Sequence, residues 1–168
     1  MLARSFLQPL AALALACGSF AAAAATAHVE FVKPESFTDA GRNYAGSERD
    51  DNLDRLARHI SQEAAKRLPA DEKLDVWVTD VDLAGYYDPR QTFTHEVRIV
   101  KDFYPPRIKL RFRLARADGG VLAEGERNLT DRNFLTHAQR YPLDGLGYEK
   151  TLLDSWFRAE FQEQRAQR

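Results

Sequence analysis

The chain has 168 residues, with 24 basic and 25 acidic side chains and a net charge of −1. This balance gives no electrostatic case for binding nucleic acid or an anionic membrane. The one cysteine, Cys17, lies in the apolar leader of the chain. The remainder therefore has no disulfide and no thiolate metal site.

Residues 1–27 read as a secretory signal peptide. Arg4 is followed by a Leu/Ala-rich run that ends in Ala25-Thr26-Ala27, an A-x-A cleavage pattern. We expect a periplasmic or secreted protein whose mature chain, residues 28–168, is a single domain. Lipidation at Cys17 is the less favoured reading, because Ala14 stands where a bacterial lipobox prefers leucine. A retained membrane anchor is also less favoured, since no basic stop-transfer segment follows.

The first half of the mature chain predicts a strand, a helix and a second strand. "HVEFV" (28–32) alternates as a strand does, and residues 49–68 carry apolar side chains spaced by three and four up to Pro69. "KLDVWVTDVDLAG" (73–85) is the strongest strand. Its apolar parity switches near Thr79–Asp80, which predicts a β-bulge.

The second half predicts a hairpin and a closing helix. The elements are strands at 95–101, 107–116 and 121–130 and a helix at 147–163. Pro105-Pro106 end the first of these strands. "ADGG" (117–120) is the hairpin turn, centred on Asp118-Gly119.

The turn fixes the register of the basic strand 107–116. Arg113 should lie opposite Glu124, and Arg111 opposite Glu126. We therefore favour a charge ladder on a solvated sheet face over a nucleic-acid surface, because no stacking aromatic residues interleave with the basic ones.

The stretch "TDVDLAGYYD" (79–88) resembles a calcium loop only in part. Asp80 and Asp82 fit the first and third positions and Gly85 the sixth, but Ala84 and Gln91 stand where carboxylate or amide ligands are needed. The histidines do not rescue a metal site, since no H-x-x-x-H or H-x-E pairing occurs among His28, His59, His95 and His137. We interpret Asp80 and Asp82 as partners of nearby basic residues or loop caps, keep them as a weak alternative metal site, and predict no cofactor.

No motif predicts catalysis. There is no G-x-S-x-G sequence, and Ser47, Ser61 and Ser155 fall on or beside predicted helices. A carboxylate pair for glycoside chemistry could be drawn from many acids and so indicates nothing. We name no catalytic residue, and the sequence leans away from an enzyme.

Two loops are unusually aromatic and are the candidate binding residues. The first holds Tyr86 and Tyr87, followed by Phe93, and the second holds Lys101, Asp102, Phe103 and Tyr104 before two prolines. Because strand 95–101 joins them, we expect two separate sites at its opposite ends. The second loop is favoured, since its prolines make it stiff. The competing interpretation is that its aromatic rings only cover the sheet edge.

Several segments resemble the secreted proteobacterial family called domain of unknown function 3016. They are "VEFVKPESFTDA", "VTDVDLAG", "VRIVKDFYPPRIKLRFRL", "EGERNLTDRNFL" and "YEKTLLDSWFRAEF". Together they cover nearly the whole mature chain. The resemblance implies export and one domain, and it implies no activity and no catalytic residues.

These elements predict an α+β fold: a single antiparallel β-sheet of four or five strands, with two main helices packed on one face and the order β-α-β-β-β-β-α. The alternative places the first strand parallel to strand 73–83 across the first helix.

Three functions stay open. The first is an exported, non-catalytic binding or accessory factor of the cell envelope. The second is an exported hydrolase using Asp and His residues, which a concave pocket with two carboxylates or a His–Asp pair would favour. The third is a subunit of an envelope complex, which would need a large exposed apolar patch. An envelope protein or a small ligand is the expected partner, and no nucleic acid and no stable membrane span after signal removal are expected.

Overall fold

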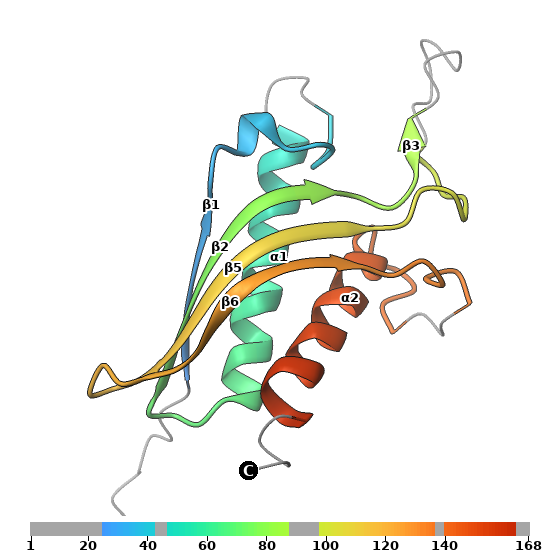
Figure 1. Ribbon diagram of the computed structural model, residues 1–168. Coiled ribbons are helices and arrows are strands. Elements are labelled where there is room, and N and C mark those ends of the chain that lie inside the picture. The colour runs from blue at the N-terminus through green and yellow to red at the C-terminus, as the bar shows by residue number, and fades with distance from the viewer. Residues whose placement is uncertain (1–24, 43–46, 88–97, 137–139, 164–168) are drawn as a thin grey trace, which may run out of the picture.

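A four-stranded sheet carries two helices on one of its faces in the computed structural model (Figure 1). The structure describes residues 25–42, 47–87, 98–136 and 140–163. The sheet has the order β1-β2-β5-β6, from β1 (Thr26–Phe31), β2 (Glu72–Asp82), β5 (Arg107–Arg116) and β6 (Val121–Thr130). The helices are α1 (Ser47–Arg67) and α2 (Gly147–Phe157), which continues as the π-helical segment η2 (Arg158–Glu163). A 3-10 turn, η1 (Pro34–Ser36), follows β1. The α+β class and the placement of both helices are confirmed.

The apolar stripe of α1 forms one side of the core. Leu53, Leu56, Ile60 and Ala64 are all buried, as their spacing by three and four predicts. The helix ends where expected, since the Leu68 N–H still donates to the Ala64 carbonyl at 2.9 Å and Pro69 follows.

Aromatic side chains of α2 and η2 fill the other side. Trp156 and Phe161 lie 5.7 and 5.6 Å from the ring of Phe112 on β5. Rings at these separations add edge-to-face attraction to the burial of apolar area. The C-terminal helix therefore packs on the inward face of β5, as its sequence pattern predicts.

The hairpin register is confirmed. Arg113 lies opposite Glu124 and Arg111 opposite Glu126. No ion pair joins either couple, although all four side chains belong to the described part of the chain. Arg111 instead lies over the ring of Trp77 on β2, with 5.8 Å from its guanidinium carbon to the ring centroid. These oppositely charged residues therefore face one another in the strand register without forming ion pairs.

The sheet is mixed, which corrects the expectation of a wholly antiparallel one. β1 runs parallel to β2, from Thr26 beside Lys73 to Phe31 beside Val78. The reason is α1, which crosses over the sheet face and returns the chain to the end where β1 began. The alternative arrangement is therefore the right one.

Two further boundaries differ from the sequence reading. In the described part of the predicted strand 95–101, only β4 (Arg98–Ile99) is a strand, and it pairs with β3 (Tyr86–Tyr87) as a separate two-stranded sheet. β2 ends at Asp82, and the predicted bulge is confirmed as a register shift between Val78 and Asp80.

At the N-terminus, β1 begins at Thr26, two residues before the predicted mature end at His28. Residues 1–24, which hold most of the predicted signal peptide, lie outside the described residues. None of the helices within the described ranges has the length and apolar character needed to cross a membrane.

Candidate functional site

The two aromatic loops come together at one end of the sheet. The ring of Tyr86 lies 4.7 Å from that of Tyr104. The Lys101 amine stands 5.9 Å above the Tyr86 ring, and the Gly85 N–H donates to the Tyr104 carbonyl at 3.0 Å. The expectation of two sites at opposite ends of a strand was wrong for Tyr86, because β3 and β4 form a short pair that brings this residue against the second loop. We call Tyr86, Lys101, Asp102, Phe103 and Tyr104 the aromatic loop cluster.

A hollow of about 370 Å³ lies beside this cluster. Its lining consists of Asp82, Leu83, Asp102, Phe103, Tyr104, Pro105, Arg107 and Arg132. Phe103 is 82% exposed and Tyr104 is 47% exposed. The packing interpretation therefore does not account for Phe103, whereas Tyr104 is half-buried against the Tyr86 ring.

Tyr87 belongs elsewhere. Its hydroxyl donates to Glu48 at 2.8 Å, and its ring lies 4.5 Å below the guanidinium carbon of Arg98. Burial, together with the Glu48 carboxylate, raises the pKa of Tyr87. This side chain ties the loop to α1 and does not join the aromatic loop cluster. Phe93 lies outside the described residues.

Arg98 anchors the loop from β4. Its guanidinium donates to both carboxylate oxygens of Asp39, at 2.9 and 2.7 Å. It also donates to the carbonyls of Leu83, Ala84 and Gly85 at 3.3–3.4 Å. Burial alone would lower the pKa of Arg98, but its bonds to Asp39 raise it overall. Sequence reasoning missed this residue, since its partners are distant in the chain.

Glu149 of α2 holds the same loop from inside. Its Oε1 accepts a hydrogen bond from the Ala84 N–H at 2.7 Å. Its Oε2 is buried and has no hydrogen-bond partner in the structure. Burial raises the pKa of this carboxyl group, and the bond from Ala84 and the charge of Arg98 do not offset that rise. The backbone of residues 83–85, which leads into Tyr86, is therefore fixed on both sides.

Asp80 and Asp82 contact basic side chains. Asp80 accepts bonds from the Thr38 N–H at 2.8 Å and hydroxyl at 3.1 Å, and lies 3.1 Å from the Lys109 amine. Burial would raise the pKa of Asp80, but these bonds lower it. Asp82 accepts from Arg107 at 3.0 and 2.5 Å. Asp80 and Asp82 therefore make the contacts expected of residues that pair with nearby basic side chains.

A cluster that sequence reasoning missed lies between α1 and α2. His59 Nε2 lies 2.9 Å from Asp154 Oδ1, and Glu63 joins them so that the three ligand atoms fall within 4.8 Å of one another. We call these three residues the buried acid–histidine cluster. The search for H-x-x-x-H overlooked the signal that was present, a histidine and a glutamate four residues apart on one helix face.

The atoms of this cluster already have partners. Glu63 accepts from Lys66 at 2.9 Å and from Arg67 at 2.5 Å, and Asp154 Oδ2 accepts from the Tyr141 hydroxyl at 3.0 Å. Burial and this bond raise the pKa of Tyr141 to about 12. The three side chains are only 2–5% exposed, so a substrate has no direct access. The arrangement works as an internal hydrogen-bond network that joins the two helices.

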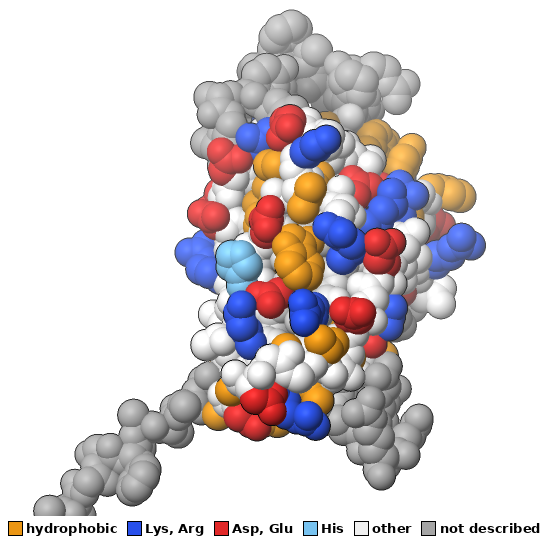
Figure 2. All heavy atoms as spheres, turned by 60° about the vertical axis from the view of Figure 1, so that its left-hand side comes forward, with side chains coloured by type: hydrophobic (Ala, Val, Ile, Leu, Met, Phe, Trp, Pro, Cys, Tyr) orange, Lys and Arg blue, Asp and Glu red, His pale blue; other side chains and the backbone are white. Residues whose placement is uncertain are grey.

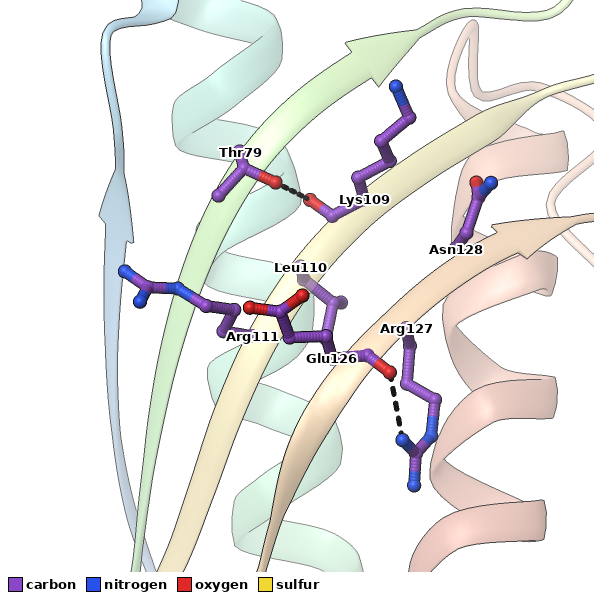
Figure 3. A pocket seen from close by; sticks show the side chains of 7 residues that line it. All are labelled: Thr79, Lys109, Leu110, Arg111, Glu126, Arg127 and Asn128. Carbon is purple, nitrogen blue, oxygen red and sulfur yellow. Dashed lines mark hydrogen bonds between the residues drawn. The ribbon is translucent and has the colours of Figure 1, made fainter.

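The uncovered face of the sheet carries a broader hollow of about 500 Å³ (Figure 3). Thr79, Lys109, Leu110, Arg111, Glu126, Arg127 and Asn128 line it. The Thr79 hydroxyl donates to the Lys109 carbonyl at 3.3 Å. Figure 2 shows basic and acidic side chains interspersed over the side of the molecule where β1 comes forward. Mixed charge of this kind is typical of a solvated sheet face.

Comparison with known proteins gives a family and no activity. No curated protein and no solved structure matches the chain. The family described as protein of unknown function (DUF3016) matches residues 25–159, which is most of the chain and nearly all of the described structure, and the chain therefore belongs to this family.

Proposed function

We propose that this protein is an exported, non-catalytic binding factor of the cell envelope, and that the aromatic loop cluster is its binding surface. The observation that carries the proposal is the contrast between two kinds of site. The side chains of the buried acid–histidine cluster, His59, Glu63 and Asp154, are shielded from solvent and bonded to neighbouring side chains. The exposed aromatic side chains border a hollow at a loop.

The loop is well suited to binding because it is fixed before any ligand arrives. Arg98 and Glu149 hold the backbone at Ala84, and the Gly85 N–H ties this segment to the Tyr104 carbonyl. Pro105-Pro106 restrict the chain that follows Tyr104. A surface that is already ordered loses little conformational entropy on association. The ring of Phe103 is almost fully exposed to water, which is unfavourable. A partner that buried this ring would therefore gain binding free energy.

The hydrolase alternative has two observations in its favour. One is the His59–Asp154 pair at 2.9 Å, and the other is the two carboxylates, Asp82 and Asp102, that line the hollow beside the aromatic loop cluster. A catalytic base must reach the proton that it abstracts. Neither His59 nor Asp154 lines either of the two hollows described above, and Tyr141 and Arg140 cover the outer oxygen of Asp154. Of the two carboxylates in the hollow beside the aromatic loop cluster, Asp82 is already bonded to Arg107. The pair therefore supports the join between helices better than it supports hydrolysis.

Export rests on the predicted signal peptide, and mass spectrometry of a fractionated native host tests it. We expect a periplasmic or secreted protein with its mature N-terminus near His28 and no intact Met1 form. A cytoplasmic protein that begins at Met1 would contradict export.

Binding is tested by photo-crosslinking in intact cells. A benzophenone amino acid replaces Phe103 in one strain and Val121 in a matched strain. Val121 is also an exposed apolar residue, at 46%, but it lies at the hairpin. We expect an adduct from position 103 and none from position 121. Equal yields at both positions would remove the aromatic loop cluster as a binding surface.

A further inference from the structure

Exposed apolar side chains gather at one end of the sheet. The register aligns the end of β2 at Asp82, the start of β5 at Arg107 and the end of β6 at Thr130. The loops that leave this end therefore project in the same direction, toward the right in Figure 1. They carry four exposed large apolar residues: Val100 at 38%, Phe103 at 82%, Tyr104 at 47% and Leu135 at 45%.

The charges in these loops come in adjacent pairs of opposite sign. Lys101 precedes Asp102, and Asp131 precedes Arg132. Asp102 and Arg132 both line the hollow beside Phe103. The surface thus offers a carboxylate for an ammonium group and a guanidinium for a phosphate group, at no net charge. A zwitterionic phospholipid head group has these two charges a few bonds from an apolar chain.

We propose that this end of the sheet docks on a zwitterionic phospholipid surface, with Phe103 inserted among the acyl chains. The inference rests on the proposed function and names the partner of the same site. Tyr86 and Tyr104 then lie at the level of the head groups, which is where tyrosine is enriched in membrane proteins. The apolar stems of Lys101 and Arg132 pack along the acyl boundary while their charged ends stay at the level of the head groups.

The physical basis is the transfer of apolar area from water. Phe103 stands at the tip of a loop whose backbone is held in place, so insertion needs no rearrangement. Because the local charges cancel, attraction to anionic lipid contributes little, and the affinity should be nearly independent of salt. This is a peripheral contact made by loops and involves no membrane span.

Sedimentation with phosphatidylethanolamine–phosphatidylcholine vesicles tests the proposal on the purified mature chain. We expect the wild-type protein to bind and Phe103→Ser to lower the partition coefficient by about tenfold or more, as the loss of a buried phenyl ring implies. Val121→Ser is the matched control and should bind like the wild type. The partition coefficient should change by less than about twofold between low and high salt. Both substitutions replace exposed side chains, and circular dichroism verifies that each variant is folded.

Three results of the sedimentation assay would overturn the inference: no binding by the wild type, equal losses in the two variants, or binding only to anionic vesicles with a steep salt dependence. The crosslink at position 103 separates this inference from the proposed function. A lipid adduct supports both. A protein adduct keeps the binding surface and rejects the lipid, and an absence of adducts rejects both.

Discussion

Glu149 offers the sharpest test of how the loop is held. Glu149→Gln keeps the oxygen that accepts the Ala84 N–H at 2.7 Å. It replaces the partnerless Oε2 with an amide nitrogen, whose donors also lack partners. At acidic pH, where the native carboxyl is neutral, this unsatisfied amide should cost about 1–3 kcal/mol of unfolding free energy.

The cost should then shrink as pH rises. Burial raises the pKa of Glu149 above that of the unfolded chain. The stability that the protonated carboxyl contributes is complete below the unfolded pKa and is lost as pH rises through the folded pKa. Glutamine does not titrate. Between the unfolded and the folded pKa of Glu149, the unfolding free energy of the variant should therefore rise relative to that of the wild type by up to about 1.4 kcal/mol per pH unit.

Urea unfolding followed by tryptophan fluorescence, from pH values below the unfolded pKa of glutamate up to mildly alkaline pH, measures both effects. Glu48→Gln is the matched control, because bonds from Arg42 and Tyr87 outweigh burial and lower the pKa of Glu48. The loss of unfolding free energy in Glu48→Gln should grow as pH rises from the folded to the unfolded pKa of Glu48, which is the opposite of the trend expected for Glu149→Gln. If Glu149→Gln instead carries a large deficit that does not change with pH, Glu149 is ionised in the folded protein and the reasoning fails.

Three further outcomes follow from the same contacts. Zinc or calcium should leave the melting temperature unchanged, since a ligand that binds only the folded state must raise it, and an increase of several degrees would revive a metal site at the acidic residues of β2 or at the buried acid–histidine cluster. Gly85→Ala should lower the unfolding free energy by at least about 2 kcal/mol more than Gly119→Ala does in chemical denaturation. Both glycines have positive φ, but a Cβ at Gly85 would meet the Ile99 carbonyl oxygen at 2.5 Å, while Gly119 faces open space. Equal losses in the two variants would refute the clash. Tyr141→Phe should lower the unfolding free energy by about 1 kcal/mol through loss of the bond to Asp154, and an unchanged value would mean that the network does not stabilise the fold.

Local patterns predicted the elements well where one rule dominates. The hairpin register follows from the turn at Asp118-Gly119, and the bulge near Thr79 follows from the switch in apolar parity. The helices follow from spacing by three and four. In each case the residues that decide the structure lie close together in the sequence, so a local pattern is enough to predict it.

Long-range contacts were out of reach of such rules. The pairing of Tyr86 with Tyr104, the reach of Arg98 to Asp39 and the meeting of His59 with Asp154 all join segments far apart in the sequence. The candidate residues of the aromatic loop cluster could be named from composition. Their convergence on one place depends on a two-residue strand, which is too short to leave a periodic signal.

The parallel placement of β1 has a consequence for the order of folding. The β5–β6 hairpin closes across four residues of turn and can form as soon as both strands exist. β1 must wait, because its neighbour β2 comes only after the whole of α1, and a chain that emerges N-terminus first presents β1 long before its partner. Closing so large a loop is entropically costly and slow. We therefore expect a late folding phase in which an otherwise assembled sheet accepts its first strand, and that strand, lying at the sheet edge, is the one whose backbone groups stay exposed for longest.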